Sequence, residues 1–243
     1  MSTKRRDDIL IELAQAYNLS EQYDKVLELM SNHTFIPCEG GEHALADQYM
    51  FAQFGLGIKA MQSKHYEEAL MRFRLAQTIP QNLGAGLWNV VKLVPHKFYE
   101  ALCLKQIGDA SEALSIFNYI CSVKKDYFSD MHLPELPIFQ GLSHLELGNQ
   151  AYGREMLIRF IKFARNSAKH HDAGFFSSTP FFISYVEDAR LCRSRYYAYL
   201  EAFGLYALNL KEEARIVADT IGFDPGHLFA AHLKATFIEE KGC

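Results

Sequence analysis

The chain has 243 residues, a net charge of −4, and 49% hydrophobic and 22% charged residues. These values are close to the averages of soluble globular chains and exclude a disordered or fibrous protein. The basic residues are dispersed and no run of about 18 apolar residues occurs, so neither a nucleic acid nor a membrane is expected as a partner. Asp7 and Asp8 directly follow the first basic residues and Glu12 ends the short apolar stretch after them, so no signal peptide is expected and the predicted location is cytoplasmic.

Helical hairpins are the predicted elements along the chain, because apolar residues recur at helical spacing and strand-like alternation is weak. A single all-α domain, 1–243, is expected, with hairpins over residues 7–31, 45–79, 95–125, 132–166 and 184–222 and a capping helix over 226–240. Asp224 and Pro225 are suitable residues for the start of that last helix.

Internal repetition is the most informative feature of the sequence. Each predicted second helix has a small or β-branched anchor residue, and these anchors, 40 to 61 residues apart, are Val26, Ala69, Ala113, Gly153 and Ala214. Each predicted first helix has a small residue where two helices can approach closely, namely Ala14, Gly57, Ala101, Gly141 and Ala202. Glycine inside a helix costs about 1 kcal/mol relative to alanine, so its recurrence predicts close helix packing.

Insertions are expected between the hairpins near residues 32–44, 81–95 and 166–182, where glycine and proline accumulate. All seven prolines lie at predicted junctions or in a first helical turn, as an all-helical protein requires.

These patterns resemble the tetratricopeptide repeat, whose usual order is leucine-glycine, tyrosine, alanine, phenylalanine, alanine and proline. The second unit carries the resemblance best, with Leu56-Gly57, Ala69, Phe73, Ala76 and Pro80. The resemblance implies a right-handed α-α superhelix that binds partners. Its standard repeat is about 34 residues, so the longer spacings here imply insertions between repeats.

A narrower resemblance covers most of the chain. The stretches 32–42, 80–86 and 224–231 are similar to the C-terminal repeat region of a bacterial family in which a mutarotase-like β-sandwich domain precedes tetratricopeptide repeats. That domain is absent from this sequence, so its activity cannot be transferred, and Cys38 stands where an aromatic residue is expected. The resemblance implies a setting in carbohydrate metabolism and supplies no catalytic residue.

Reactive side chains do not form a catalytic motif. The five cysteines are scattered without a C-x-x-C pair, which predicts reduced structural thiols. His33, Cys38 and His43 have a spacing that a metal could use, but no fourth ligand is near and a structural loop is favoured. Residues 169–172 and 82–86 are likewise interpreted as loops. The prediction is a non-enzymatic protein with no catalytic residue, no metal and no cofactor.

An apolar, aromatic face on the first helices is the predicted binding surface, because first helices line the concave side of such arrays. Its residues are Phe51, Phe54, Phe98, Leu102, Ile138, Leu142, Tyr196, Tyr199 and Phe203. A groove of this kind suits a protein or peptide segment, which predicts a scaffold or adaptor. Two alternatives remain: the insertions at 81–95 and 166–182 fill the groove, or the chain forms a homodimer through it.

A rival interpretation is a sugar-recognising accessory of bacterial carbohydrate metabolism. Its candidate residues lie on loops and are His33, Glu39, Asn82 and Trp88. A sugar site presents polar groups beside an aromatic ring in one pocket, so these residues must converge.

Overall fold

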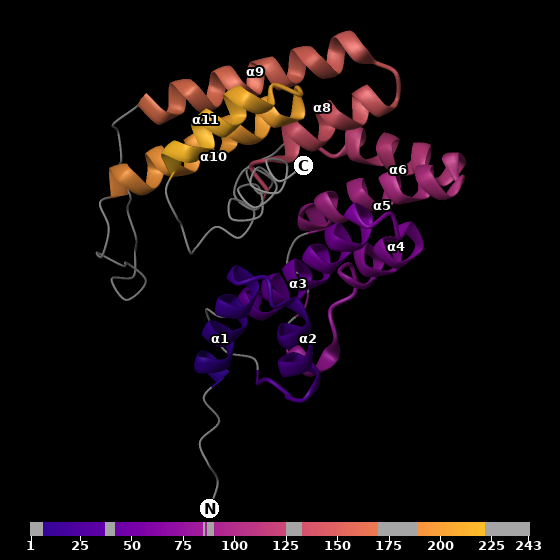
Figure 1. The fold of residues 1–243 in the computed structure, drawn as a ribbon, viewed down its shortest axis with the longest axis vertical. Helices are drawn as coiled ribbons and strands as arrows, with labels where there is room; N and C mark the ends of the chain where they lie inside the picture. The colour runs from indigo at the N-terminus through magenta and orange to yellow at the C-terminus, as the bar shows by residue number, and fades with distance from the viewer. Residues whose placement is uncertain are drawn as a thin grey trace, which may run out of the picture. The chain divides into compact units, whose positions relative to one another are not determined.

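All the secondary structure of the described residues is helical, in agreement with the prediction of an all-α fold. The structure is a computed structural model that describes residues 7–36, 42–84, 86, 90–124, 133–169 and 189–221. The helices are α1 (Asp7–Leu19), α2 (Tyr23–Ser31), α3 (Glu42–Gln62), α4 (Tyr66–Leu75), α5 (Val94–Ile107), α6 (Ala110–Ser122), α8 (Leu136–Glu146), α9 (Gln150–Lys169), α10 (Ala189–Ala207) and α11 (Lys211–Ile221), with 3-10 turns at Gln81–Leu83 and Val90–Leu93 (Figure 1). The predicted cap over 226–240 lies outside the described residues.

Two compact units divide the chain, Met1–Phe139 and Gln140–Cys243. In the first unit each helix packs on the next from α1 to α6, and in the second α9 packs on α10 and α10 on α11. The predicted insertion at 166–182 begins later than expected, because α9 continues to Lys169. Among the described residues, no helix has the length and apolarity that crossing a bilayer requires.

The same turn joins the two helices of every pair. Its left-handed residue, two positions before the second helix, is Glu21, Lys64, Gly108, Gly148 and Asn209 in turn. The next residue donates its N–H to the carbonyl five positions earlier, as from His65 to Ala60 at 2.9 Å and from Asn149 to His144 at 2.8 Å. This is the Schellman arrangement, which satisfies carbonyl groups that a helix end leaves without partners. The five helix pairs therefore share the same kind of connection.

Lys64→Gly is expected to raise the free energy of unfolding by about 1 kcal/mol. Lys64 has φ +63°, a region that costs a side-chain-bearing residue roughly 1–2 kcal/mol and glycine almost nothing. Ser63→Gly is the matched control, and we expect a small loss of stability there because glycine only adds freedom to the unfolded chain. Urea unfolding followed by circular dichroism measures both, and a loss of stability in Lys64→Gly contradicts the prediction.

Small residues lie buried where the helices approach, as the repeat pattern predicts. The buried anchors are Val26, Ala69, Ala113, Gly153 and Ala214, and the buried small residues of the first helices are Ala14, Gly57, Ala101, Gly141 and Ala202. A Cβ atom on Gly153 would lie 2.7 Å from the carbonyl oxygen of Gly141, and one on Gly57 would lie 2.6 Å from the Phe73 ring. The glycines therefore permit helix contacts that alanine would obstruct.

Aromatic rings form the core of the first unit. Phe54 of α3 contacts Phe73 of α4 and both His96 and Tyr99 of α5, with ring centroids 5.1 to 5.7 Å apart. Phe98 of α5 makes further edge contacts with neighbouring rings. Such pairs contribute about 0.5–1.5 kcal/mol each beyond the burial of their area. Aromatic packing thus joins three consecutive helices.

Candidate functional site

The predicted aromatic face divides into buried and half-buried residues. Phe51, Phe54, Phe98, Ile138 and Tyr199 are buried, whereas Leu102, Leu142, Tyr196 and Phe203 are half-buried. The five buried side chains belong to the hydrophobic core and do not offer a partner an accessible surface. The physical reason is visible at Phe54, whose ring is enclosed by rings from α4 and α5.

The predicted loop site is described in part, and its described residues do come together. Asn82 donates from Nδ2 to the carbonyl oxygens of Met30 and His33, at 2.7 and 2.8 Å. Its own carbonyl accepts the N–H of Phe35 at 2.8 Å. The segment after α2 is therefore bound to the 3-10 turn at Gln81–Leu83. Glu39 and Trp88 lie outside the described residues.

His33 is also engaged by a carboxylate. Its Nε2 lies 2.9 Å from Oδ1 of Asp7, whose Oδ2 accepts the N–H of Ile36 at 3.0 Å. Asp7 therefore fastens the start of α1 to the segment after α2. Cys38 and the side chain of His43 lie outside the described part of the chain, and within that part no three His, Cys, Asp or Glu side chains gather as a metal site. The polar groups observed here have structural partners.

A buried carboxylate joins α4 to α5. Glu100 is 6% exposed and accepts hydrogen bonds from Arg74 Nε at 2.7 Å and from Gln77 Nε2 at 2.6 Å. Arg74 also bonds Glu112 of α6 at 2.8 Å, and its hydrogen bond and attraction to Glu100 raise the pKa of the guanidinium. A paired, hydrogen-bonded charge of this kind fixes the register between helices, and removing one partner is costly.

The described thiols are not activated as nucleophiles. Burial, and secondarily the nearby charge of Glu100, raise the pKa of Cys103 to about 12. Burial also raises the pKa of Cys121. A nucleophilic cysteine needs thiolate, which such environments disfavour. Both residues are free cysteines, and Cys103 is buried.

A shallow depression runs along the outer side of α4. Its lining residues are Glu67, Leu70, Met71, Arg74, Leu75 and Thr78. Arg74, the cation among them, is already engaged by Glu100 and Glu112. The positive charge of this lining is therefore already shared with two carboxylates of neighbouring helices.

The outward side of α9 carries exposed apolar residues that sequence reasoning missed. Tyr152 is 55% exposed, Ile158 43% and Phe163 50%. Tyr152, Met156 and Phe163 stand at helical spacings i, i+4 and i+11 and lie on one side of the helix; we call them the α9 strip. Large apolar side chains on the solvent side of an amphipathic helix are the signal that could have revealed it.

Aromatic contacts extend the α9 strip onto α10. The Phe163 ring contacts Tyr197 at 6.2 Å between centroids, and Tyr197 contacts Tyr196 at 5.4 Å. At the other end of the strip, Tyr152 packs edge-on against His144 at 4.7 Å. Tyr196, one of the predicted face residues, therefore adjoins this surface.

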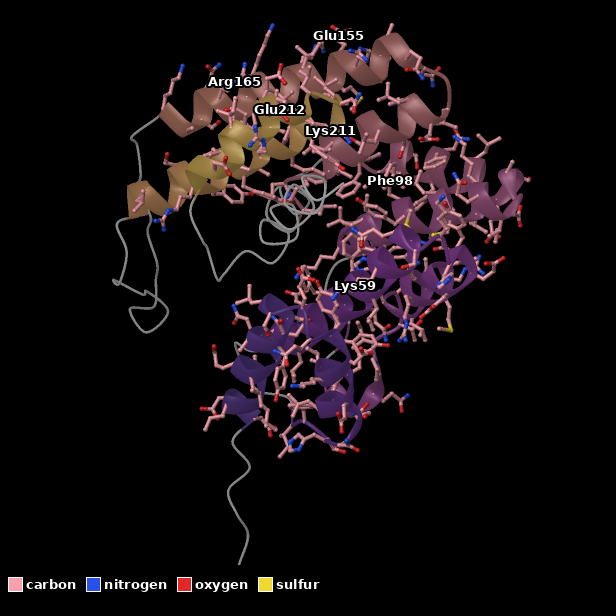
Figure 2. All side chains as sticks on the ribbon, viewed as in Figure 1. Lys59, Phe98, Glu155, Arg165, Lys211 and Glu212 are labelled. Atoms are coloured by element: carbon pink, nitrogen blue, oxygen red, sulfur yellow. The ribbon has the colours of Figure 1, made fainter. Side chains whose placement is uncertain are left out.

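Positive charge is concentrated on helix α9. The helix contains one acidic residue, Glu155, and five basic residues, which we call the α9 cations: Arg154, Arg159, Lys162, Arg165 and Lys169. Arg159 pairs with Glu155 and Arg165 with Glu201 of α10, the latter at 2.6 Å; Figure 2 labels Glu155 and Arg165 on α9. Arg154, Lys162 and Lys169 are exposed and make no ion pair with the described residues. Cations beside apolar side chains make this face the strongest candidate for a binding surface.

Fold and surface together define a helical-hairpin protein with an exposed cationic and aromatic helix face. No protein-family model matches the sequence, and no solved structure matches the fold.

Proposed function

We propose that the chain is a non-catalytic scaffold that binds a protein or peptide segment. The observation that carries this proposal is the α9 strip, where Tyr152 and Phe163 expose half of their surface on a helix whose Lys162 and Lys169 have no ion pair with the described residues. Exposed apolar groups of this size are typical of interaction surfaces, and aromatic residues with arginine are enriched at interface centres.

A tetratricopeptide-like superhelix is the architecture we propose for the hairpins. Five identical turns, buried small residues at the helix crossings and the contact of Gly141 with Gly153 support it. Repeats of this kind present extended surfaces to partners. The half-buried residues Leu102, Leu142, Tyr196 and Phe203 remain candidates on the first helices.

The binding proposal is tested by exchanging exposed apolar residues for serine. Tyr152→Ser with Phe163→Ser is expected to abolish the capture of partners from a cell extract while the helical circular dichroism remains, because the altered side chains are half exposed. The matched control is Leu114→Ser with Tyr119→Ser on α6, residues that are 46% and 43% exposed. Unchanged capture by the α9 variant, or equal losses in both variants, contradicts the proposal.

The sugar-recognition alternative has less support. The Nδ2 group of Asn82 is already used by two backbone carbonyls, and His33 by Asp7. A sugar needs polar groups that remain available to it. The geometry of the described residues therefore favours the scaffold.

A further inference from the structure

The charges and the apolar side chains on α9 indicate the chemical class of the partner. We infer that the α9 strip, together with Lys162 and Lys169 of the α9 cations, binds an acidic amphipathic protein segment, one with carboxylates alongside large apolar side chains. This inference rests on the proposed scaffold function and names the partner class of the same surface.

Positive charge is unevenly distributed along the chain. The whole chain has a net charge of −4, yet α9 contains five basic residues and one acidic residue. A row at spacings of three and four residues places Glu155, Arg159, Lys162, Asn166 and Lys169 next to the α9 strip. Such a local excess of positive charge attracts a negatively charged partner and repels a basic one.

The pairing of the cations shows which of them are available to a partner. Arg165 donates to Glu201, whose side chain is only 15% exposed, so this pair holds α9 against α10. The pair between Arg159 and Glu155 is open to solvent and contributes little to stability. Lys162 and Lys169 lie seven residues apart on the same side, about 10 Å along the helix, and have no ion pair with the described residues. They are placed to meet two carboxylates of one segment.

The sparse cations beside the α9 strip favour a protein segment over a nucleic acid. Nucleic-acid binding uses many closely spaced cations along a chain of phosphates, whereas Glu155 and Asn166 interrupt this row and leave Lys162 and Lys169 as two separate charges. Tyr152 and Phe163 are aromatic and Met156 is aliphatic, and all three lie on one side of the helix. They suit the apolar side chains of an amphipathic segment, with the lysines on its acidic border.

Fluorescence anisotropy with the full chain and labelled peptides tests the inference. The probes are a short peptide that alternates Glu with Leu and Phe, the same peptide with Lys for Glu, an oligoglutamate and a single-stranded RNA. We expect the acidic amphipathic peptide to bind best, with an affinity that falls at least about tenfold between about 0.1 M and about 1 M salt. The other three probes should bind at least about tenfold more weakly, because each lacks the charge or the apolar side chains that the surface recognises.

Charge reversal identifies the residues involved. The double variant Lys162→Glu with Lys169→Glu should bind the acidic peptide about tenfold more weakly than the natural chain does. Its affinity should also depend less on the salt concentration, because two attractions become repulsions. Lys124→Glu, an exposed lysine of the first unit, is the control and should leave binding unchanged. The double variant Tyr152→Ser with Phe163→Ser should also bind the acidic peptide more weakly. Circular dichroism verifies the fold of each variant.

Several results would overturn the inference. These are equal binding of acidic and basic peptides, tighter binding of RNA, no effect of the lysine reversals, or self-association of the chain that the serine variant abolishes. If any of them occurs while capture from extracts still depends on Tyr152 and Phe163, the scaffold function survives and only the acidic partner class fails. If capture is independent of these residues, the proposed function itself fails.

Discussion

Phe73→Ala is expected to lower the free energy of unfolding by about 4 kcal/mol. The Phe73 ring is fully buried, packs against Phe54 and Tyr99 at 5.7 and 5.6 Å between centroids, and fills the space above Gly57. Truncating a buried phenylalanine to alanine typically costs 3–5 kcal/mol, because transfer energy is lost and a cavity remains. Urea unfolding monitored by circular dichroism at several protein concentrations measures the change.

The matched control for Phe73 is Phe163→Ala. Both residues lie on second helices, but Phe163 is half exposed, so we expect a loss of about 1 kcal/mol or less. A comparable loss of stability in the two variants would contradict the burial of the Phe73 ring. Because both variants replace phenylalanine by alanine, the difference between the two losses of stability reports the burial of the ring.

His96 is expected to make the protein less stable as the pH falls below about 6.5. Complete burial lowers the pKa of His96 from 6.5 to about 4, and hydrogen bonding to the backbone of Met50 and Lys92 opposes only part of this effect. The unfolded chain binds a proton below pH 6.5, whereas the folded chain does not until about pH 4. The contribution of neutral His96 to stability is therefore fully present above pH 6.5. As the pH falls from 6.5 to about 4, the free energy of unfolding decreases by about 3 kcal/mol in total, at 1.36 kcal/mol per pKa unit.

The His96→Gln variant separates this effect from the titration of carboxylates. The stability difference between the natural chain and the variant should shrink by about 2 kcal/mol between pH 7 and pH 5, because only the natural chain loses the contribution. Phe117→Leu, a buried change that removes no titratable group, is the control and should differ from the natural chain equally at both pH values. A pH-independent difference for His96→Gln contradicts the assignment.

Local patterns in the sequence were sufficient to predict the helices and the buried side of each second helix. The residue four positions after each anchor is buried in every hairpin, and these residues are Met30, Phe73, Phe117, Leu157 and Ala218. Prediction succeeded here because a helix places residues i and i+4 on one side, so the periodicity of apolar residues reports which side is buried.

The candidate site was less predictable. The sequence interpretation placed Phe54 and Phe98 on an open groove because they lie away from the expected contact with the second helix. Both rings instead contact the second helix of their own hairpin and also the first helix of the next one, Phe54 through Tyr99 and Phe98 through Phe139, which a periodicity within one helix cannot reveal. Helix α3 is buried around most of its circumference and shows almost no amphipathic pattern for this reason.

The sequence by itself determined that this protein is helical, that its helices come in pairs and that small residues mark their crossings, since these features depend on neighbours within one or two turns. Tertiary structure decided which aromatic residues are core and which are surface. Phe73 and Phe163 are both phenylalanines on second helices, yet Phe73 is enclosed by rings of α3 and α5 whereas Phe163 is half exposed. Burial of a side chain depends on contacts between segments distant in the sequence, and only the folded arrangement specifies them.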